Sequence, residues 1–249
     1  MIVKQSPLFH ASANWATPFL VALVTGAAGS VACSQAPSSA PAQQTATPAS
    51  QPETIPRADR PPFELAQVGE SATSLFDAAV ASDWNTAQEL IQELKHAASS
   101  LPNAMPKPDI VAQLRTRLRW LGDHVADKQR VETMDDANAI TRFVADLSAE
   151  YQTYVPYEVV MLGYYGRQLE LGIAAGQVQT LKKASTDLRS TWNRVQPSLE
   201  RRGHIDDARR FTDIVVDLEG ARRPAQFVAP TRAELAEADH IAKMFRSPS

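Results

Sequence analysis

Apolar positions along most of the chain recur at spacings of three and four residues, which place side chains on one face of an α-helix. One such stripe runs through Leu90 and Leu94, and another runs through Leu114 and Leu118. No segment shows the sustained alternation of apolar and polar residues that indicates a β-strand. The pattern therefore predicts that residues 63–249 form an all-α domain, a multi-helix bundle of about seven to eight helices.

Capping residues, glycines and prolines divide this pattern into separate helices. Asp83 is a favourable N-cap, because its carboxylate can accept a hydrogen bond from a free N–H group in the first turn. Two Thr-x-x-acid stretches, at 133–136 and 231–234, have the spacing of a capping box and predict that a helix begins at each threonine. The predicted helices are 63–81, one that follows Asp83, 110–125, one that opens at Thr133, one from Pro156 to about Gly176, one from about Gln177 that must bend or stop near Pro197, 204–220, and one from Thr231 through Phe245.

One stretch of the chain has a similar counterpart further on. Residues 135–147 and 206–218 share seven identical positions, and their apolar stripes fall in the same register. Each copy follows a segment that contains Leu-Arg and a tryptophan. Two interpretations stay open, a duplicated helical hairpin or the chance convergence of two amphipathic helices.

The first 62 residues carry no helical stripe of this kind. Lys4 precedes an apolar run, from Phe19 onward, which has the length of a signal-peptide core and is too short to cross a bilayer. The run ends in small residues followed by Cys33. In this the segment resembles a bacterial lipoprotein precursor, in which the cysteine is diacylated and becomes the first residue of the mature chain. The resemblance implies that residues 1–32 are removed and that Cys33 anchors the protein in a membrane.

Neighbouring residues refine this implication. Ser30 stands where the lipoprotein pattern has an aliphatic residue, and Ser30 with Ala32 also suits ordinary signal-peptidase cleavage, so simple secretion is the alternative. Ser34 stands where an aspartate would retain a lipoprotein in the inner membrane. The resemblance therefore implies an exported protein that faces the periplasm from the outer membrane. Residues 34–62 contain seven prolines among Ala, Ser, Thr and Gln, which predicts a disordered tether.

Composition excludes several classes of function. The formal net charge is −3, so no basic field attracts nucleic acid. Cys33 is the single cysteine, which excludes an intrachain disulfide and a cysteine metal cluster. No glycine-rich phosphate loop, nucleophile elbow or histidine-based catalytic constellation occurs. We therefore expect a protein that is not an enzyme and that needs no cofactor.

Two Glu-x-x-His pairs, which end at His96 and His240, have the spacing that supplies ligands to di-iron centres in helical bundles. At ~100° per residue, both histidines fall well away from the apolar stripe of their helix. We therefore expect both imidazoles to face solvent, and we predict no metal site. His124 and His204, which neighbour aspartates, are interpreted as helix-end charges, with a surface metal site as the alternative.

All five tyrosines lie within fifteen residues, from 151 to 165, at the end of one predicted helix and the start of the next. The second of these helices is apolar on opposite faces, which is typical of a central helix. It also carries Arg167 and Glu170, whose spacing allows an ion pair. The candidate ligand or partner site consists of Tyr154, Tyr157, Tyr164, Tyr165, Arg167 and Glu170.

Two roles are open to these residues. An arginine near several phenols can hold an anionic or aromatic ligand, or a side chain of a partner. The favoured alternative is structural: Arg167 and Glu170 satisfy each other's charge, and tyrosine hydroxyls complete the network.

The sequence leaves two classes of function. The first is a membrane-tethered cell-envelope lipoprotein that acts as a non-catalytic binding or adaptor module for an envelope component. The second is a periplasmic carrier that holds a small ligand or a metal within the bundle. A pocket lined by Tyr164, Tyr165 and Arg167 would favour a carrier, whereas an exposed apolar patch over a filled bundle would favour an adaptor.

Overall fold

Eight α-helices, and no strand, make up the part of the chain that the computed structural model describes, which is residues 55–56 and 59–246. In chain order they are α1 (Phe63–Ala81), α2 (Trp84–Ser99), α3 (Pro108–Ala126), α4 (Arg130–Ser148), α5 (Tyr157–Ala175), α6 (Val178–Arg201), α7 (Ile205–Gly220) and α8 (Pro224–Arg246). The all-α class and the number of helices are therefore confirmed. The predicted signal segment, Cys33 and most of the predicted tether lie outside the described residues.

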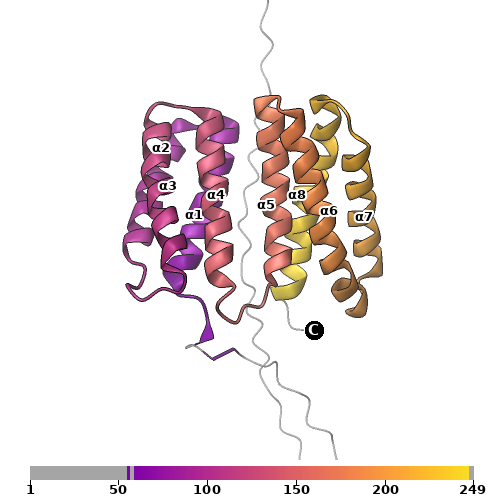
Figure 1. Cartoon of the computed structure of the whole chain (residues 1–249), viewed down its shortest axis with the longest axis horizontal. Coiled ribbons are helices and arrows are strands. Elements are labelled where there is room, and N and C mark those ends of the chain that lie inside the picture. Colours follow the sequence, from indigo (N-terminus) through magenta and orange to yellow (C-terminus); the bar gives the residue numbers. More distant parts are fainter. Residues whose placement is uncertain (1–54, 57–58, 247–249) are drawn as a thin grey trace, which may run out of the picture. The chain divides into compact units, whose positions relative to one another are not determined.

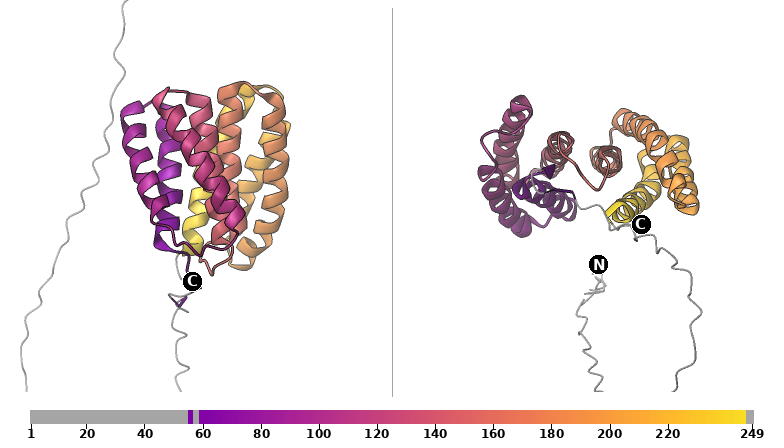
Figure 2. Two further views of the ribbon diagram at one scale, coloured as in Figure 1. Left: turned by 60° about the vertical axis from the view of Figure 1, so that its left-hand side comes forward. Right: turned by 90° about the horizontal axis from the view of Figure 1, so that it is seen from below.

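The helices form two four-helix bundles that stand side by side (Figure 1). In the first bundle, α1 to α4 pack in chain order, and α4 returns to pack against α1. In the second bundle, α5 to α8 repeat this arrangement, and α8 packs against α5. The bundles meet where α4 packs against α5, and the end-on view in Figure 2 shows α1 and α8 on the same side of that pair. Among the described helices, α1 and α8 make no close backbone contact.

Each bundle encloses its own hydrophobic core. Phe76, Leu114 and Ile140 are fully buried in the first bundle. Trp192 and Phe211 are fully buried in the second, with their ring centroids 4.5 Å apart. The first core also takes in Leu171 of α5, so the two cores come close to each other along part of the α4–α5 contact.

Several predicted helix ends are confirmed. Asp83 precedes α2, and its carboxylate accepts a hydrogen bond from the backbone N–H of Thr86 at 3.2 Å. Gly176 follows α5 in the left-handed conformation with φ 67°, which glycine adopts without the steric cost of a Cβ. Gly203 takes a similar conformation, φ 87°, between α6 and α7.

Both predicted capping boxes are wrong. Helix α4 begins at Arg130 and α8 begins at Pro224, so Thr133 and Thr231 lie inside helices and are buried. Asp136 is buried as well, and its carboxylate accepts a hydrogen bond from Arg117 at 2.5 Å. It also lies 2.8 Å from His124 Nδ1. This acidic residue therefore links α3 to α4 and does not cap a helix.

Two prolines lie inside helices. Helix α6 does not stop at Pro197 but continues to Arg201, and α8 includes Pro230, which precedes the predicted helix start at Thr231. A proline removes one backbone donor, but buried residues on both sides of it hold the helix to its neighbours. In α6 these are Val195 and Leu199.

The two similar stretches of sequence lie in helices with different surroundings. Residues 135–147 belong to α4, which packs against α1, α3 and α5. Residues 206–218 belong to α7, which packs against α6 and α8. In the order of packing, the counterpart of α4 in the second bundle is α8. The structure therefore favours convergence of two amphipathic helices over a duplicated hairpin.

Candidate ligand groove

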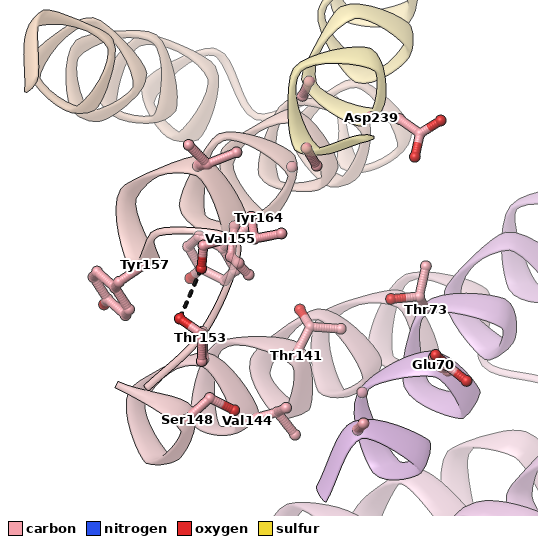
Figure 3. A pocket seen from close by; sticks show the side chains of 18 of the residues that line it. Glu70, Thr73, Thr141, Val144, Ser148, Thr153, Val155, Tyr157, Tyr164 and Asp239 are labelled. Carbon is pink, nitrogen blue, oxygen red and sulfur yellow. Dashed lines mark hydrogen bonds between the residues drawn. The ribbon is translucent and has the colours of Figure 1, made fainter. Parts of the chain in front are cut away.

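A groove of about 490 Å³ runs along the seam between the two bundles. Residues of α1, α4, α5 and α8 line it, together with residues of the α4–α5 loop (Figure 3). Because α4 and α5 touch while α1 and α8 do not, the first pair forms the floor and the second pair forms the walls. The volume lies within the range of roughly 300–1,000 Å³ that is typical of small-ligand sites.

Small residues keep the groove open. Ala66 and Gly69 line it from α1, Gly163 from α5, and Ala238 and Ala242 from α8. With two separate cores, no bulky side chain is needed at these positions to fill a common interior. The groove is thus a consequence of two bundles that share a single helix-to-helix contact.

Most charged side chains of the groove lie near the end where Thr73 of α1 is located. Glu70 on α1 and Asp239 on α8 stand on opposite walls (Figure 3). Arg167 of α5 lines the same part, whereas Arg246 lies at the other end of the groove, at the end of α8. Apolar side chains, among them Val144, Val155 and Val160, line the floor and the loop.

Arg167 lies among carboxylates without forming an ion pair. Its guanidinium donates a hydrogen bond to the carbonyl oxygen of Gly163 at 3.1 Å. Burial lowers the pKa of Arg167, and four surrounding carboxylates oppose that shift. They belong to Asp77, Glu234, Glu170 and Asp239. Within the described residues, no carboxylate oxygen comes within ion-pair distance of Arg167, so the expected Arg167–Glu170 ion pair is absent.

Glu234 of α8 is the most unusual of these carboxyl groups. It is fully buried, and neither of its oxygens has a hydrogen-bond partner in the structure. A Cβ added to Gly166 on α5 would lie 2.9 Å from the carboxyl carbon of Glu234. Burial raises the pKa of Glu234 well above its ordinary value, although Arg167 opposes the shift, and this favours the neutral form of the group.

The tyrosines do not complete a network around Arg167. Tyr157 donates its hydroxyl hydrogen bond to Asp146 at 2.8 Å, and burial together with that bond raises its pKa to about 12. The ring of Tyr164 lies 5.8 Å from the guanidinium of Arg142 and meets the edge of the Tyr165 ring. The predicted role of tyrosine hydroxyls in satisfying Arg167 is therefore wrong.

Of the six candidate residues, the groove brings together three: Tyr157, Tyr164 and Arg167. The other three lie elsewhere. Tyr154 is exposed on the α4–α5 loop, and Tyr165 packs against the core of the second bundle. Glu170 lines a second, smaller cavity of about 250 Å³ between the bundles, which it shares with Arg130 and Arg232.

Sequence reasoning missed the contributions of α1, α4 and α8. Glu70, Thr141 and Asp239 are ordinary polar residues on amphipathic helices, and no local pattern marks them. Glu234 did carry a signal, because it occupies the apolar stripe that runs from Phe227 through Ile241 of α8. An acidic residue on such a stripe indicates a buried carboxyl group, but its spacing from a threonine was interpreted as a capping box.

His96 and His240 are exposed, as predicted. The structure nevertheless brings His240 together with Asp207 and Glu237, and ligand atoms of these three residues lie within 4.8 Å of one another. They are the group that could hold a metal ion. Arg210 donates hydrogen bonds to both carboxylates, so a guanidinium already balances their charge.

No protein-family model, curated protein or solved structure matches this chain. Among the described residues, no helix is both long enough and apolar enough to span a membrane. Any conclusion about function therefore rests on the groove and on the residues around it.

Proposed function

We propose that this chain is a non-catalytic binding protein that holds its ligand in the groove between the two bundles. The observation that carries the proposal is the groove itself, a lined space of about 490 Å³ between the two bundles. Ligand sites of helical proteins commonly lie between helices, where apolar walls meet a few polar groups.

The lining favours binding over catalysis. Among the described residues that line the groove there is no histidine or cysteine, and the side-chain hydroxyls belong to threonine, serine and tyrosine. A hydroxyl nucleophile needs an adjacent general base, and Glu70 and Asp239 have no hydrogen bond to a lining hydroxyl among the described contacts. The carboxylates therefore act as fixed charges.

Two kinds of binding protein fit this site. Two of the three residues that were expected to line the pocket of a carrier, Tyr164 and Arg167, lie in the groove, whereas Tyr165 does not, and these two favour a carrier of a small ligand. Exposed apolar side chains near it, Tyr154 on the loop and Val160 in the lining, favour a protein partner as the second candidate. We give precedence to the carrier because four helices and the α4–α5 loop contribute side chains to the lining.

The second part of the proposal concerns location. We propose that the protein is exported and anchored in the cell envelope through acylated Cys33, facing the periplasm from the outer membrane. The support is the sequence of residues 30–33, with small residues before the single cysteine, and the proline-rich stretch that follows. A long tether would allow the binding domain to work at a distance from its membrane.

Blocking the groove tests the proposed site. Ala66 is exposed on α1 and lines the groove, so Ala66→Trp should fill it without disturbing either core. Ala112→Trp, at an exposed position of α3 outside the groove, is the matched control. The probe is Nile red, a neutral dye whose fluorescence rises in apolar surroundings, added to the Cys33→Ser chain in detergent-free buffer. We expect saturable binding that is lost in Ala66→Trp and kept in the control. No binding, or equal binding by both variants, would contradict the proposal.

A further inference from the structure

The second cavity between the bundles, of about 250 Å³, lies at the end of the seam opposite the α4–α5 loop (Figure 1). The C-terminal ends of α1 and α5, the start of α4 and a stretch of α8 line it. Its volume is just below the range of roughly 300–1,000 Å³ that is typical of sites for drug-sized ligands. The cavity therefore suits a smaller molecule than the groove does.

Charges of both signs line this cavity. Glu170 of α5 is half-buried there, and Arg130 of α4 and Arg232 of α8 line it from exposed positions. Burial raises the pKa of Glu170, and both arginines oppose that shift. Asp77 and Arg167 also act on Glu170, with opposite signs, but they line no part of this cavity.

The charges of the lining do not pair directly with one another. Within the described residues, neither Arg130 nor Arg232 comes within ion-pair distance of Glu170. Arg130 donates a hydrogen bond to the carbonyl oxygen of Ala79 at 3.3 Å, and Arg232 forms no hydrogen bond with a described residue. Two guanidinium groups and a carboxylate thus remain available to a molecule that enters the space.

A second, independent observation concerns a hydroxyl group in the same lining. Thr231 of α8 is 1% exposed and lines the cavity, and its hydroxyl has no hydrogen-bond partner. Other hydroxyls inside helices of this protein donate to the carbonyl oxygen four residues earlier, as Ser185 does at 3.0 Å and Thr212 at 2.8 Å. A buried polar group without a partner costs free energy, so a bound molecule that supplies one is favoured.

The rest of the lining is apolar and comes from all four helices: Val80, Met134, Ile173, Ala174 and Val228. Val228 of α8 is exposed to solvent in spite of its apolar side chain. A ligand with an aliphatic part would cover this surface, and removing apolar surface from water is favourable.

We propose that this cavity is a second binding site, separate from the groove, for a small α-amino acid with an aliphatic side chain. Arg130 and Arg232 bind its carboxylate, since guanidinium groups match carboxylate geometry, and the Thr231 hydroxyl adds a hydrogen bond. Glu170 binds its ammonium group. A simple anion would meet Glu170 as a like charge, and a simple cation would meet two arginines, whereas a zwitterion satisfies both signs.

Three probes that differ only in their charged groups test this class. L-valine carries an ammonium and a carboxylate group, isovalerate lacks the ammonium group, and isobutylamine lacks the carboxylate. Each is titrated by calorimetry into the detergent-free Cys33→Ser chain near neutral pH and at low ionic strength. We expect valine to bind about tenfold more tightly than either analogue, because each analogue leaves charged groups of the site without a partner.

Variants of the lining locate the two charged ends of the ligand. Arg232→Gln should weaken valine binding about tenfold through the carboxylate, and Glu170→Gln should do the same through the ammonium group. Glu170→Gln should not weaken binding of isovalerate, which has no group for that carboxylate to bind. Arg115→Gln, at an exposed position of α3, is the control and should leave the affinity unchanged. The circular dichroism spectrum and melting temperature show that each variant is folded.

The outcomes separate this site from the groove. Valine binding that persists in Ala66→Trp and falls in Arg232→Gln and Glu170→Gln supports the second site, whatever the result with Nile red. Valine binding that is lost in Ala66→Trp places the molecule in the groove and overturns the inference. Isovalerate binding as tight as that of valine overturns the zwitterion, and no binding of valine overturns the site, while the proposed function is left to its own test.

Discussion

The carboxyl group of Glu234 on α8 occupies the space where a side chain on Gly166 of α5 would begin. A Cβ at Gly166 would lie 2.9 Å from the carboxyl carbon of Glu234 and 2.6 Å from Cδ2 of Leu235. Real Cβ atoms do not approach other heavy atoms this closely, so a side chain at Gly166 would force the side chains of Glu234 and Leu235 to shift. The position of the groove wall depends on this approach, because Leu235 lines the groove.

Gly166→Ala should therefore destabilise the second bundle. Overpacking of a closed interior typically costs about 1–3 kcal/mol, and equilibrium unfolding in urea measures the loss. Gly220→Ala is the control, since nothing lies within 4 Å of a Cβ at that position, and its stability should stay within about 0.5 kcal/mol of the parent. Equal stability of Gly166→Ala and the parent chain would contradict the packing described above.

Glu234 should also make stability depend on pH. Its pKa in the folded chain is raised well above 4.5, so the folded state keeps a proton that the unfolded chain releases above about pH 4.5. Stability is then lost as pH rises from about 4.5 toward the raised pKa. Glu234→Gln should remove this dependence and raise stability at pH 7.5 by about 1–3 kcal/mol.

Unfolding titrations in urea between pH 5 and pH 8 measure that slope. Glu93→Gln, at an exposed position on α2, should leave it unchanged. If the stability of the parent chain rises over this pH range and that of Glu234→Gln does not, the carboxyl group of Glu234 is ionised in the folded state.

Arg167 should stabilise the seam through the carboxylates of Asp77, Glu170 and Asp239 together rather than through one ion pair. Arg167→Met removes their shared cation, and we expect a loss of roughly 1–3 kcal/mol at neutral pH, measured by thermal and urea unfolding. Adding Glu170→Met to this variant should restore only a small part of the lost stability, because Asp77 and Asp239 keep their charges. Full recovery in the double variant would indicate an Arg167–Glu170 pair after all.

The buried carboxylate of Asp136 should contribute more to the free energy of unfolding than the carboxylate of its neighbour Asp135. Asp136→Asn removes the charge that Arg117 and His124 share, and we expect a loss of roughly 2–3 kcal/mol. Asp135→Asn is the matched control, since Asp135 contacts the same Arg117 from a half-exposed position and its loss should cost less than about 1 kcal/mol. The ranking is tested by urea unfolding at pH 7, and the opposite order would contradict it.

Cys33→Ser should release the protein from the membrane into the soluble fraction, because each acyl chain contributes about 0.8 kcal/mol per buried methylene group to membrane binding. Fractionation of the cells measures this, and intact-mass measurement of the parent chain should show acyl groups on an N-terminal Cys33. An unmodified chain that begins at Cys33 would contradict the proposed anchor.

The sequence by itself determined that the domain is helical and which faces most helices bury, although α4 and α8 begin before the predicted threonines. Leu90, Leu94 and the residues like them recur at helical spacing, and such spacing depends only on the geometry of one helix. The exposure of His96 and His240 followed from the same geometry, as did the cap that Asp83 provides for α2.

Only the tertiary structure decided which polar residues are buried and which of them meet. Glu234 looked like the third residue of a capping box, yet it is buried, because Gly166 on α5 leaves room for a carboxyl group at that point. Glu70 and Asp239 lie far apart in the sequence and face one groove because α1 and α8 each pack beside the central α4–α5 pair. The packing of one helix against another depends on the combined shape of both surfaces, which no single segment of sequence contains.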